Sequence, residues 1–88
     1  MATTEEQFKK AAEDALKLPP TTTDADKLIL YGLYKQATVG NNETSRPGML
    51  DFKGKAKWDA WKKCEGKSAD DAMKDYIAKV EQLMEATA

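Results

Sequence analysis

The sequence contains no histidine and only one cysteine, Cys64. Histidine is the usual general base near neutral pH, so its absence excludes Ser/His and Cys/His nucleophile pairs. A single cysteine cannot form a disulfide within the chain, which fits a reducing compartment. A lone cysteine among lysines, without histidines, also argues against zinc. We therefore expect no catalytic residues, no metal site and no enzyme.

Long apolar runs and cofactor motifs are also missing. The first residues lack the basic and apolar regions of a signal peptide, and no apolar stretch is long enough to span a membrane. The chain has neither a GxxxxGK phosphate loop nor a CxxC pair. These absences predict a soluble, cytoplasmic protein without a cofactor. With 88 residues, 41% of them hydrophobic, we expect one globular domain over residues 1–88.

Apolar residues recur at helical spacing in four segments and predict an all-α fold. The first helix covers about residues 5–17, with a capping box at Thr3 or Thr4, and ends before Pro19-Pro20. The second is capped within residues 21–23 and stops at Gly40. The third covers residues 52–64, and the fourth begins near Ser68. The apolar face of the first helix comprises Phe8, Ala11, Ala12, Ala15 and Leu16. The stripe of the fourth comprises Ala69, Met73, Tyr76, Ile77, Val80, Leu83 and Met84.

The segment between the second and third predicted helices, residues 40–50, is rich in Asn, Ser, Pro and Gly. These residues favour turns and stop a helix from continuing. A loop of this length is uncommon as a simple connection in a compact domain and is more often functional. We therefore expect it to lie near a binding site.

Positive charge is concentrated in the middle of a chain whose net charge is −1. Between Lys35 and Lys67 there are eight basic and four acidic residues, which leaves six of the fourteen basic and eleven of the fifteen acidic residues elsewhere. Tyrosines and tryptophans alternate with these lysines. The combination predicts a site for a phosphorylated ligand that has a flat aromatic face.

Two residues on the second helix have the spacing of a phosphate site. Tyr31 and Lys35 are four residues apart and share a helix face, and Tyr34 lies next to them. A hydroxyl and an ammonium group would converge there on an oxyanion, where charge-assisted hydrogen bonds are strong. On the third helix, Lys53 and Lys57 also share a face. Taken singly, each of these residues is more typical of a half-buried ring or a solubilising lysine.

Two consecutive runs resemble the signature of the small, single-domain acyl-CoA-binding proteins. They are YGLYKQATVG over residues 31–40 and RPGMLDFKGKAKWDAW over residues 46–61. The similarity extends to Phe8 in the first helix and to residues 72–77 in the fourth, so it covers essentially the whole chain. The resemblance implies a four-helix up-down-down-up bundle that binds medium- to long-chain fatty acyl-CoA and acts as its intracellular carrier and pool former.

The resemblance also implies which residues contact the ligand. By position these are Tyr31, Gly32, Leu33, Tyr34, Lys35, Lys57 and Tyr76. Tyr31, Lys35 and Lys57 would hold the ribose 3′-phosphate, Tyr34 would stack on adenine, and Tyr76 would reach the CoA head. Trp58 would lie along the acyl chain. Some relatives have a lysine facing the CoA phosphates where this chain has Leu16, so both Leu16 and the following Lys17 are candidate contacts.

Two other function classes are compatible with the residues alone. The basic third helix resembles a docking surface for an acidic partner or nucleic acid, but the molecule is slightly acidic and has no recognised nucleic-acid motif. A thioesterase is the other alternative. The resemblance favours a protein that binds fatty acyl-CoA and no nucleic acid. We expect a monomer, because one bundle accounts for the apolar stripes. Transient contact with acyl-CoA-using enzymes or with anionic membrane surfaces is compatible with this role.

Overall fold

The computed structural model describes residues 2–86, and within this range the chain forms four helices and no strand. The helices are α1 (Thr4–Ala15), α2 (Asp24–Thr38), α3 (Phe52–Lys62) and α4 (Ala69–Ala86). The predicted all-α fold is confirmed. None of these four helices is both long and apolar enough to cross a membrane.

Each helix begins at a side-chain oxygen that accepts a backbone N–H. Thr3 Oγ1 accepts from the N–H of Glu6 at 3.2 Å, and Thr23 Oγ1 accepts from the N–H of Asp26 at 3.1 Å. Asp51 and Ser68 accept in the same way at the starts of α3 and α4. These caps satisfy donors that the first turn of a helix leaves unpaired. The predicted start of α2 after the threonine run is confirmed.

Two helices end earlier than the sequence predicts. α1 ends at Ala15 instead of Lys17, and α3 ends at Lys62 instead of Cys64. After α1 the N–H of Lys17 bonds to the carbonyl of Asp14, and after α3 the N–H of Cys64 bonds to that of Trp61, in each case three residues back. Such bonds tighten the final turn and close the helix.

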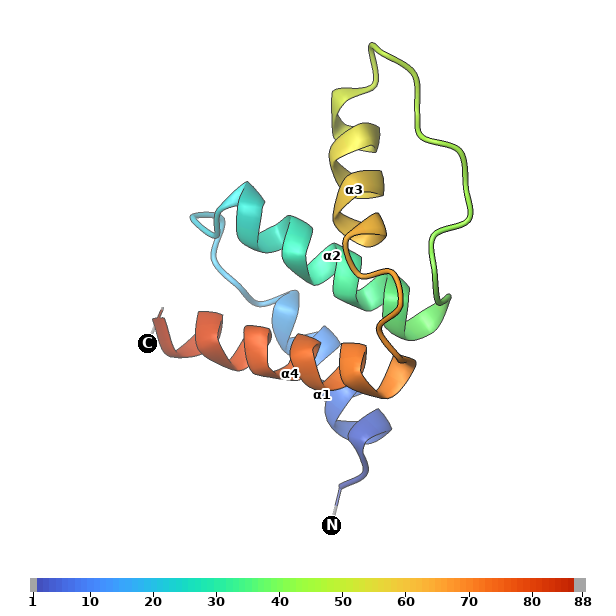
Figure 1. Ribbon diagram of the computed structural model, residues 1–88. Helices are drawn as coiled ribbons and strands as arrows, with labels where there is room; N and C mark the ends of the chain where they lie inside the picture. Colours follow the sequence, from blue (N-terminus) through green and yellow to red (C-terminus); the bar gives the residue numbers. More distant parts are fainter. Residues whose placement is uncertain (1, 87–88) are drawn as a thin grey trace.

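The helices pack in the order α1, α4, α2, α3, which differs from their order in the chain (Figure 1). α4 contacts both α1 and α2 and runs antiparallel to α2, while α3 packs on α2. The core comprises Phe8 and Ala11 of α1, Leu30, Leu33 and Ala37 of α2, and Ala72, Tyr76 and Val80 of α4. The core therefore lies among α1, α4 and α2, and α3 extends from one side of it.

Two predicted apolar positions are wrong. Leu16 is 87% exposed, because α1 has already ended and the chain turns away from the core. Ala69 is exposed at the first residue of α4, whereas Ala72, which the predicted stripe omits, is fully buried. Ala72 forms an i, i+4, i+8 row with Tyr76 and Val80, and this row faces the core.

The absence of a side chain at Gly32 allows α2 and α3 to approach closely. A Cβ atom at Gly32 would lie 2.4 Å from the carbonyl oxygen of Ala60, closer than real Cβ contacts come. Trp61, the buried residue of α3, donates its indole N–H to the carbonyl of Gly40 at 2.7 Å. The close approach at Gly32 and the Trp61–Gly40 hydrogen bond together hold α3 in place on α2.

The loop between α2 and α3 is attached to α3 by a small polar network. Asn42 is almost fully buried and donates its amide to the carbonyl of Trp58 at 3.2 Å. The Trp58 indole N–H in turn donates to the carbonyl and to the hydroxyl of Thr44, both at 3.0 Å. The loop therefore has a defined path, and Trp58 lies on the loop side of α3.

Candidate ligand site

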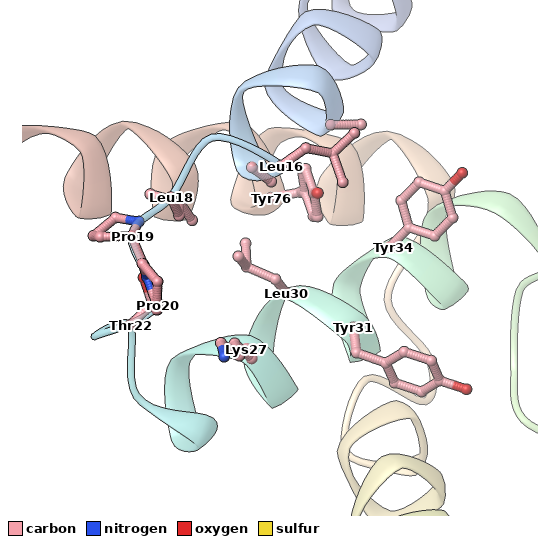
Figure 2. Close-up of a pocket in the computed structure, with 12 residues that line it drawn as sticks. Leu16, Leu18, Pro19, Pro20, Thr22, Lys27, Leu30, Tyr31, Tyr34 and Tyr76 are labelled. Atoms are coloured by element: carbon pink, nitrogen blue, oxygen red, sulfur yellow. The ribbon is translucent and has the colours of Figure 1, made fainter.

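A pocket of about 570 Å³ lies between α1, α2 and α4 (Figure 2). It is lined by Ala12, Ala15, Leu16, Leu18, Pro19, Pro20, Thr22, Lys27, Leu30, Tyr31, Tyr34 and Tyr76. The lining is largely apolar, and the lining residues with polar side chains are Thr22, Lys27, Tyr31, Tyr34 and Tyr76. A hollow of this size with a few polar groups is typical of a small-molecule site. We call it the tyrosine pocket.

Aromatic rings form one wall of the tyrosine pocket. Phe8 stacks on Tyr34 with ring centroids 5.6 Å apart, and it meets Tyr76 edge-on at 5.1 Å. Tyr34 nevertheless remains 43% exposed. Tyr31 and Tyr34 extend from α2 toward the same side of the pocket (Figure 2). Phe8 therefore packs against the Tyr34 ring, which is still accessible to a flat ligand.

Tyr76 is the one buried tyrosine of this wall, with 5% of its surface exposed. Burial, followed by the neighbouring Tyr34, raises the pKa of the Tyr76 phenol above its ordinary value of 10. The hydroxyl therefore keeps its proton at neutral pH. It is available as a neutral donor in the pocket.

Two lysines lie where α2 and α3 meet. Lys57 Nζ, from α3, is 5.6 Å from the centroid of the Tyr31 ring. Lys35 Nζ, one helical turn after Tyr31 on α2, is 4.8 Å from the Trp61 ring. Contacts between ammonium groups and ring faces restrain the long lysine side chains. Lys57 from α3 therefore lies beside Tyr31, and Lys35 lies one turn farther along α2.

A second hollow, of about 380 Å³, lies on the surface shared by α2 and α3. It is lined by Asp24, Lys27, Leu28, Phe52, Lys53, Ala56 and Lys57. Its apolar lining residues are Leu28, Phe52 and Ala56, and its charged ones are three lysines and Asp24. We call it the α2–α3 groove. Lys27 lines both the groove and the tyrosine pocket, so the two hollows adjoin.

The structure brings five of the ten predicted ligand residues to these hollows. Leu16, Tyr31, Tyr34 and Tyr76 line the tyrosine pocket, and Lys57 lines the α2–α3 groove. Lys35 stands at the α2–α3 junction, as described above. Convergence of Tyr31 with Lys57, from two different helices, is the central geometric feature of the site.

Four other predicted contacts lie elsewhere. Gly32 is packed against the backbone of α3, and Leu33 belongs to the core. Lys17 is exposed in the turn after α1, and Trp58 lies against the α2–α3 loop. For these residues the structure provides a packing or surface position, and their contact with a ligand stays a prediction.

Lys27 is the residue that the sequence reasoning missed. It precedes Tyr31 by four residues, the same spacing that singled out Lys35 on the other side of Tyr31. The α2–α3 groove was also missed. Its lining residues come from α2 and α3, so the groove depends on how closely these two helices pack. Helical periodicity does not indicate that packing.

Comparison with known proteins identifies the family. The family model described as acyl CoA binding protein matches residues 5–80. The acyl-CoA-binding protein of Ricinus communis is 62% identical over 79 residues, or 90% of this chain and 88% of the relative. That of Brassica napus is 61% identical over 83 residues, or 94% and 90%. The crystal structure of Oryza sativa acyl-CoA-binding protein 2 matches with a TM-score of 0.94 and 55% identity, covering 97% of this chain and 94% of that one. The chain therefore belongs to the acyl-CoA-binding protein family.

Proposed function

We propose that the protein binds medium- to long-chain fatty acyl-CoA and acts as its intracellular carrier and pool former. The observation that supports this most directly is the adjacency of the tyrosine pocket and the apolar α2–α3 groove, which share Lys27. An acyl-CoA has two corresponding parts, a phosphorylated adenine nucleotide and an apolar chain. Membership of the family, and the names of the relatives above, support the same ligand.

The nucleotide end of the ligand fits the tyrosine pocket. The exposed face of Tyr34, supported by Phe8, would stack on adenine. Tyr31, Lys35 and Lys57 would hold the ribose 3′-phosphate, because charge-assisted hydrogen bonds to a phosphate are the strongest contacts available there. Tyr76, which keeps its proton, would donate to the CoA head from α4.

The acyl chain fits the α2–α3 groove, over Leu28, Phe52 and Ala56. Burial of a palmitoyl tail of ~14 methylenes, at ~0.8 kcal/mol each, contributes roughly 11 kcal/mol. Association costs about 4–15 kcal/mol, so the tail alone roughly balances that cost. Tight binding therefore requires the head and the tail together.

The proposal includes no chemical change of the ligand. The sequence has no histidine to activate a serine or cysteine against the thioester. We further propose a cytoplasmic monomer, since the apolar faces of α1, α2 and α4 are used within one core. Its partners would be the enzymes that supply and use acyl-CoA, contacted transiently.

Calorimetric titration with palmitoyl-CoA, CoA and palmitate, side by side, tests the proposal. We expect palmitoyl-CoA to bind far more tightly than either fragment. Equal affinity for CoA and palmitoyl-CoA would show that the groove holds no chain. Chromatography of the recovered ligand should return an intact thioester, and hydrolysis at a rate above a protein-free control would indicate an esterase instead.

A further inference from the structure

Three large apolar side chains are exposed where the chain enters α3, two in the turn before the helix and one at its first residue. Met49 is 82% exposed, Leu50 is 88% exposed and Phe52 is 72% exposed. The turn forms one end of the molecule, above the first turn of α3 (Figure 1). We call residues 49–52 the apolar tip. Exposed large apolar residues that occur together, rather than singly, mark interaction surfaces.

Hydrogen bonds within the turn and the start of α3 hold the apolar tip in shape. Lys55 Nζ donates to the carbonyl of Met49 at 2.9 Å, and the N–H of Asp51 donates to the carbonyl of Gly48 at 3.1 Å. The carboxylate of Asp51 is engaged in capping α3, where it accepts from Gly54 at 2.9 Å. The apolar side chains are thus presented on an ordered turn, which lowers the entropic cost of binding.

The charge around the apolar tip is mainly positive, although Asp24 lines the α2–α3 groove together with Phe52 and Lys53. Lys53, Lys55 and Lys57 follow the tip on the first turns of α3, and Asp51 is the acidic residue within it. Arg46 and Asp59, farther along the same region, form a bidentate pair and offset each other. An apolar tip followed by lysines is complementary to a surface whose outer layer is anionic and whose inner layer is apolar.

We propose that the apolar tip docks on an anionic lipid bilayer. Met49, Leu50 and Phe52 enter the boundary between headgroups and acyl chains, and the lysines stay at the level of the phosphates. Phe52 and Lys53 also line the α2–α3 groove, so the groove begins at the tip. Docking therefore brings the mouth of the groove to the membrane. The docking surface does not depend on the proposed function, but its use in moving an acyl chain between bilayer and groove rests on it.

Co-sedimentation of the ligand-free protein with vesicles tests the docking surface. The vesicles contain equal amounts of phosphatidylcholine and phosphatidylserine, and phosphatidylcholine vesicles serve as the comparison. We expect Leu50→Asp to lower the partition coefficient at least about tenfold, because an anionic side chain replaces an apolar one at the membrane boundary. Val39→Asp is the matched control, since Val39 is 61% exposed at the far end of α2. Val39→Asp should lower the partition coefficient much less than Leu50→Asp does.

A second pair of variants tests how much the lysine charges contribute to vesicle binding. Lys53→Gln should weaken binding to the anionic vesicles about fivefold, whereas Lys9→Gln on α1 should leave it unchanged. Added salt should weaken wild-type binding as well. Thermal unfolding of Leu50→Asp should match that of the wild type, because the side chain is exposed.

Any of three results would overturn the docking proposal. The wild-type protein could stay in the supernatant, Leu50→Asp and Val39→Asp could partition equally, or the wild type could bind neutral and anionic vesicles equally. Concentration-dependent dimers in vesicle-free ultracentrifugation that Leu50→Asp abolishes would assign the tip to a second copy instead. Failure of palmitoyl-CoA to bind in solution would overturn the proposed function while leaving the vesicle result intact.

Discussion

The ammonium group of Lys57 on α3 lies 5.6 Å from the centroid of the Tyr31 ring on α2. Neither residue alone is distinctive, and their meeting depends on the close packing of the two helices at Gly32. A cation and a phenol at one point, with Lys35 one turn away, are the groups that we propose hold the phosphate.

Removal of either lysine should weaken ligand binding much more than it destabilises the fold. We predict that Lys57→Ala and Lys35→Ala each lower the affinity for palmitoyl-CoA by about 1.5–3 kcal/mol, the value of a hydrogen bond to a charged group. The free energy of unfolding should change by less than about 0.5 kcal/mol, as for most surface substitutions. Calorimetry and urea denaturation measure the two quantities.

The 3′-phosphate can be tested separately with an acyl-CoA that lacks it. Wild-type protein should bind this analogue far less tightly than palmitoyl-CoA, and the difference should shrink in the Lys35→Ala/Lys57→Ala double variant. If the wild type binds both ligands equally, these lysines contact another part of the ligand.

Lys27 should act at the junction between head and tail. We expect Lys27→Ala to reduce palmitoyl-CoA affinity by about 1.5–3 kcal/mol and Lys27→Arg to restore most of it, since arginine keeps the charge. Lys9→Ala, on α1, is the matched control. An unchanged affinity in Lys27→Ala would mean that the ligand does not pass from the pocket into the groove at this residue.

Gly32→Ala should destabilise the protein by about 1–3 kcal/mol, because its methyl group would collide with the carbonyl of Ala60 and force α2 and α3 apart. The control is Gly48→Ala, whose Cβ would meet no atom of residues 2–86 within 4 Å. Denaturant unfolding compares the two. Equal stabilities would mean that α3 shifts on α2 at little cost, and Lys57 would then not be held beside Tyr31.

The two tryptophans should behave differently. Trp61 is 7% exposed, so Trp61→Ala should cost on the order of 3–5 kcal/mol in unfolding free energy. In the Trp61→Phe protein, Trp58 fluorescence should change more with palmitoyl-CoA than with CoA if the chain passes this ring, as the family resemblance predicts. Identical responses would place the chain away from Trp58 and its contact with Thr44.

The stability of the fold should depend on pH through an ion pair between α2 and α4. Lys79 Nζ lies 2.9 Å from a carboxylate oxygen of Asp26, and this bond, with one from Thr23, lowers the pKa of Asp26 below 3.8. A lowered pKa stabilises the fold above the pKa of the unfolded chain, and this stabilisation is lost as the pH falls through the folded value. The stability difference between wild type and Asp26→Asn should therefore be largest near pH 7 and shrink below about pH 4. A constant difference across this range would contradict the assignment.

Local features of the sequence predicted the helices well, because caps and apolar spacing act within a few residues. The start of α2 after Thr23 and the stop before Gly40 are confirmed. The ends of α1 and α3 were placed too late, since a tightened last turn has no clear residue signature. The family resemblance, rather than spacing, identified Lys57 as a partner of Tyr31. Lys27 was missed although its spacing to Tyr31 equals that of Lys35. The α2–α3 groove was missed because it depends on the close approach of α3 to α2 at Gly32 and Ala60, which lie far apart in the sequence.

The packing order of the helices has a consequence for synthesis. α1 buries Phe8 against α4, which is made last of these four helices, and Phe8 meets Tyr76 ring to ring. A nascent α1 therefore lacks its main packing partner until α4 follows, although Tyr34 of α2 can already contact Phe8. By contrast, α2 and α3 are neighbours both in the chain and in space. Packing of α1 on α4, which lie far apart in the sequence, is the long-range step of folding.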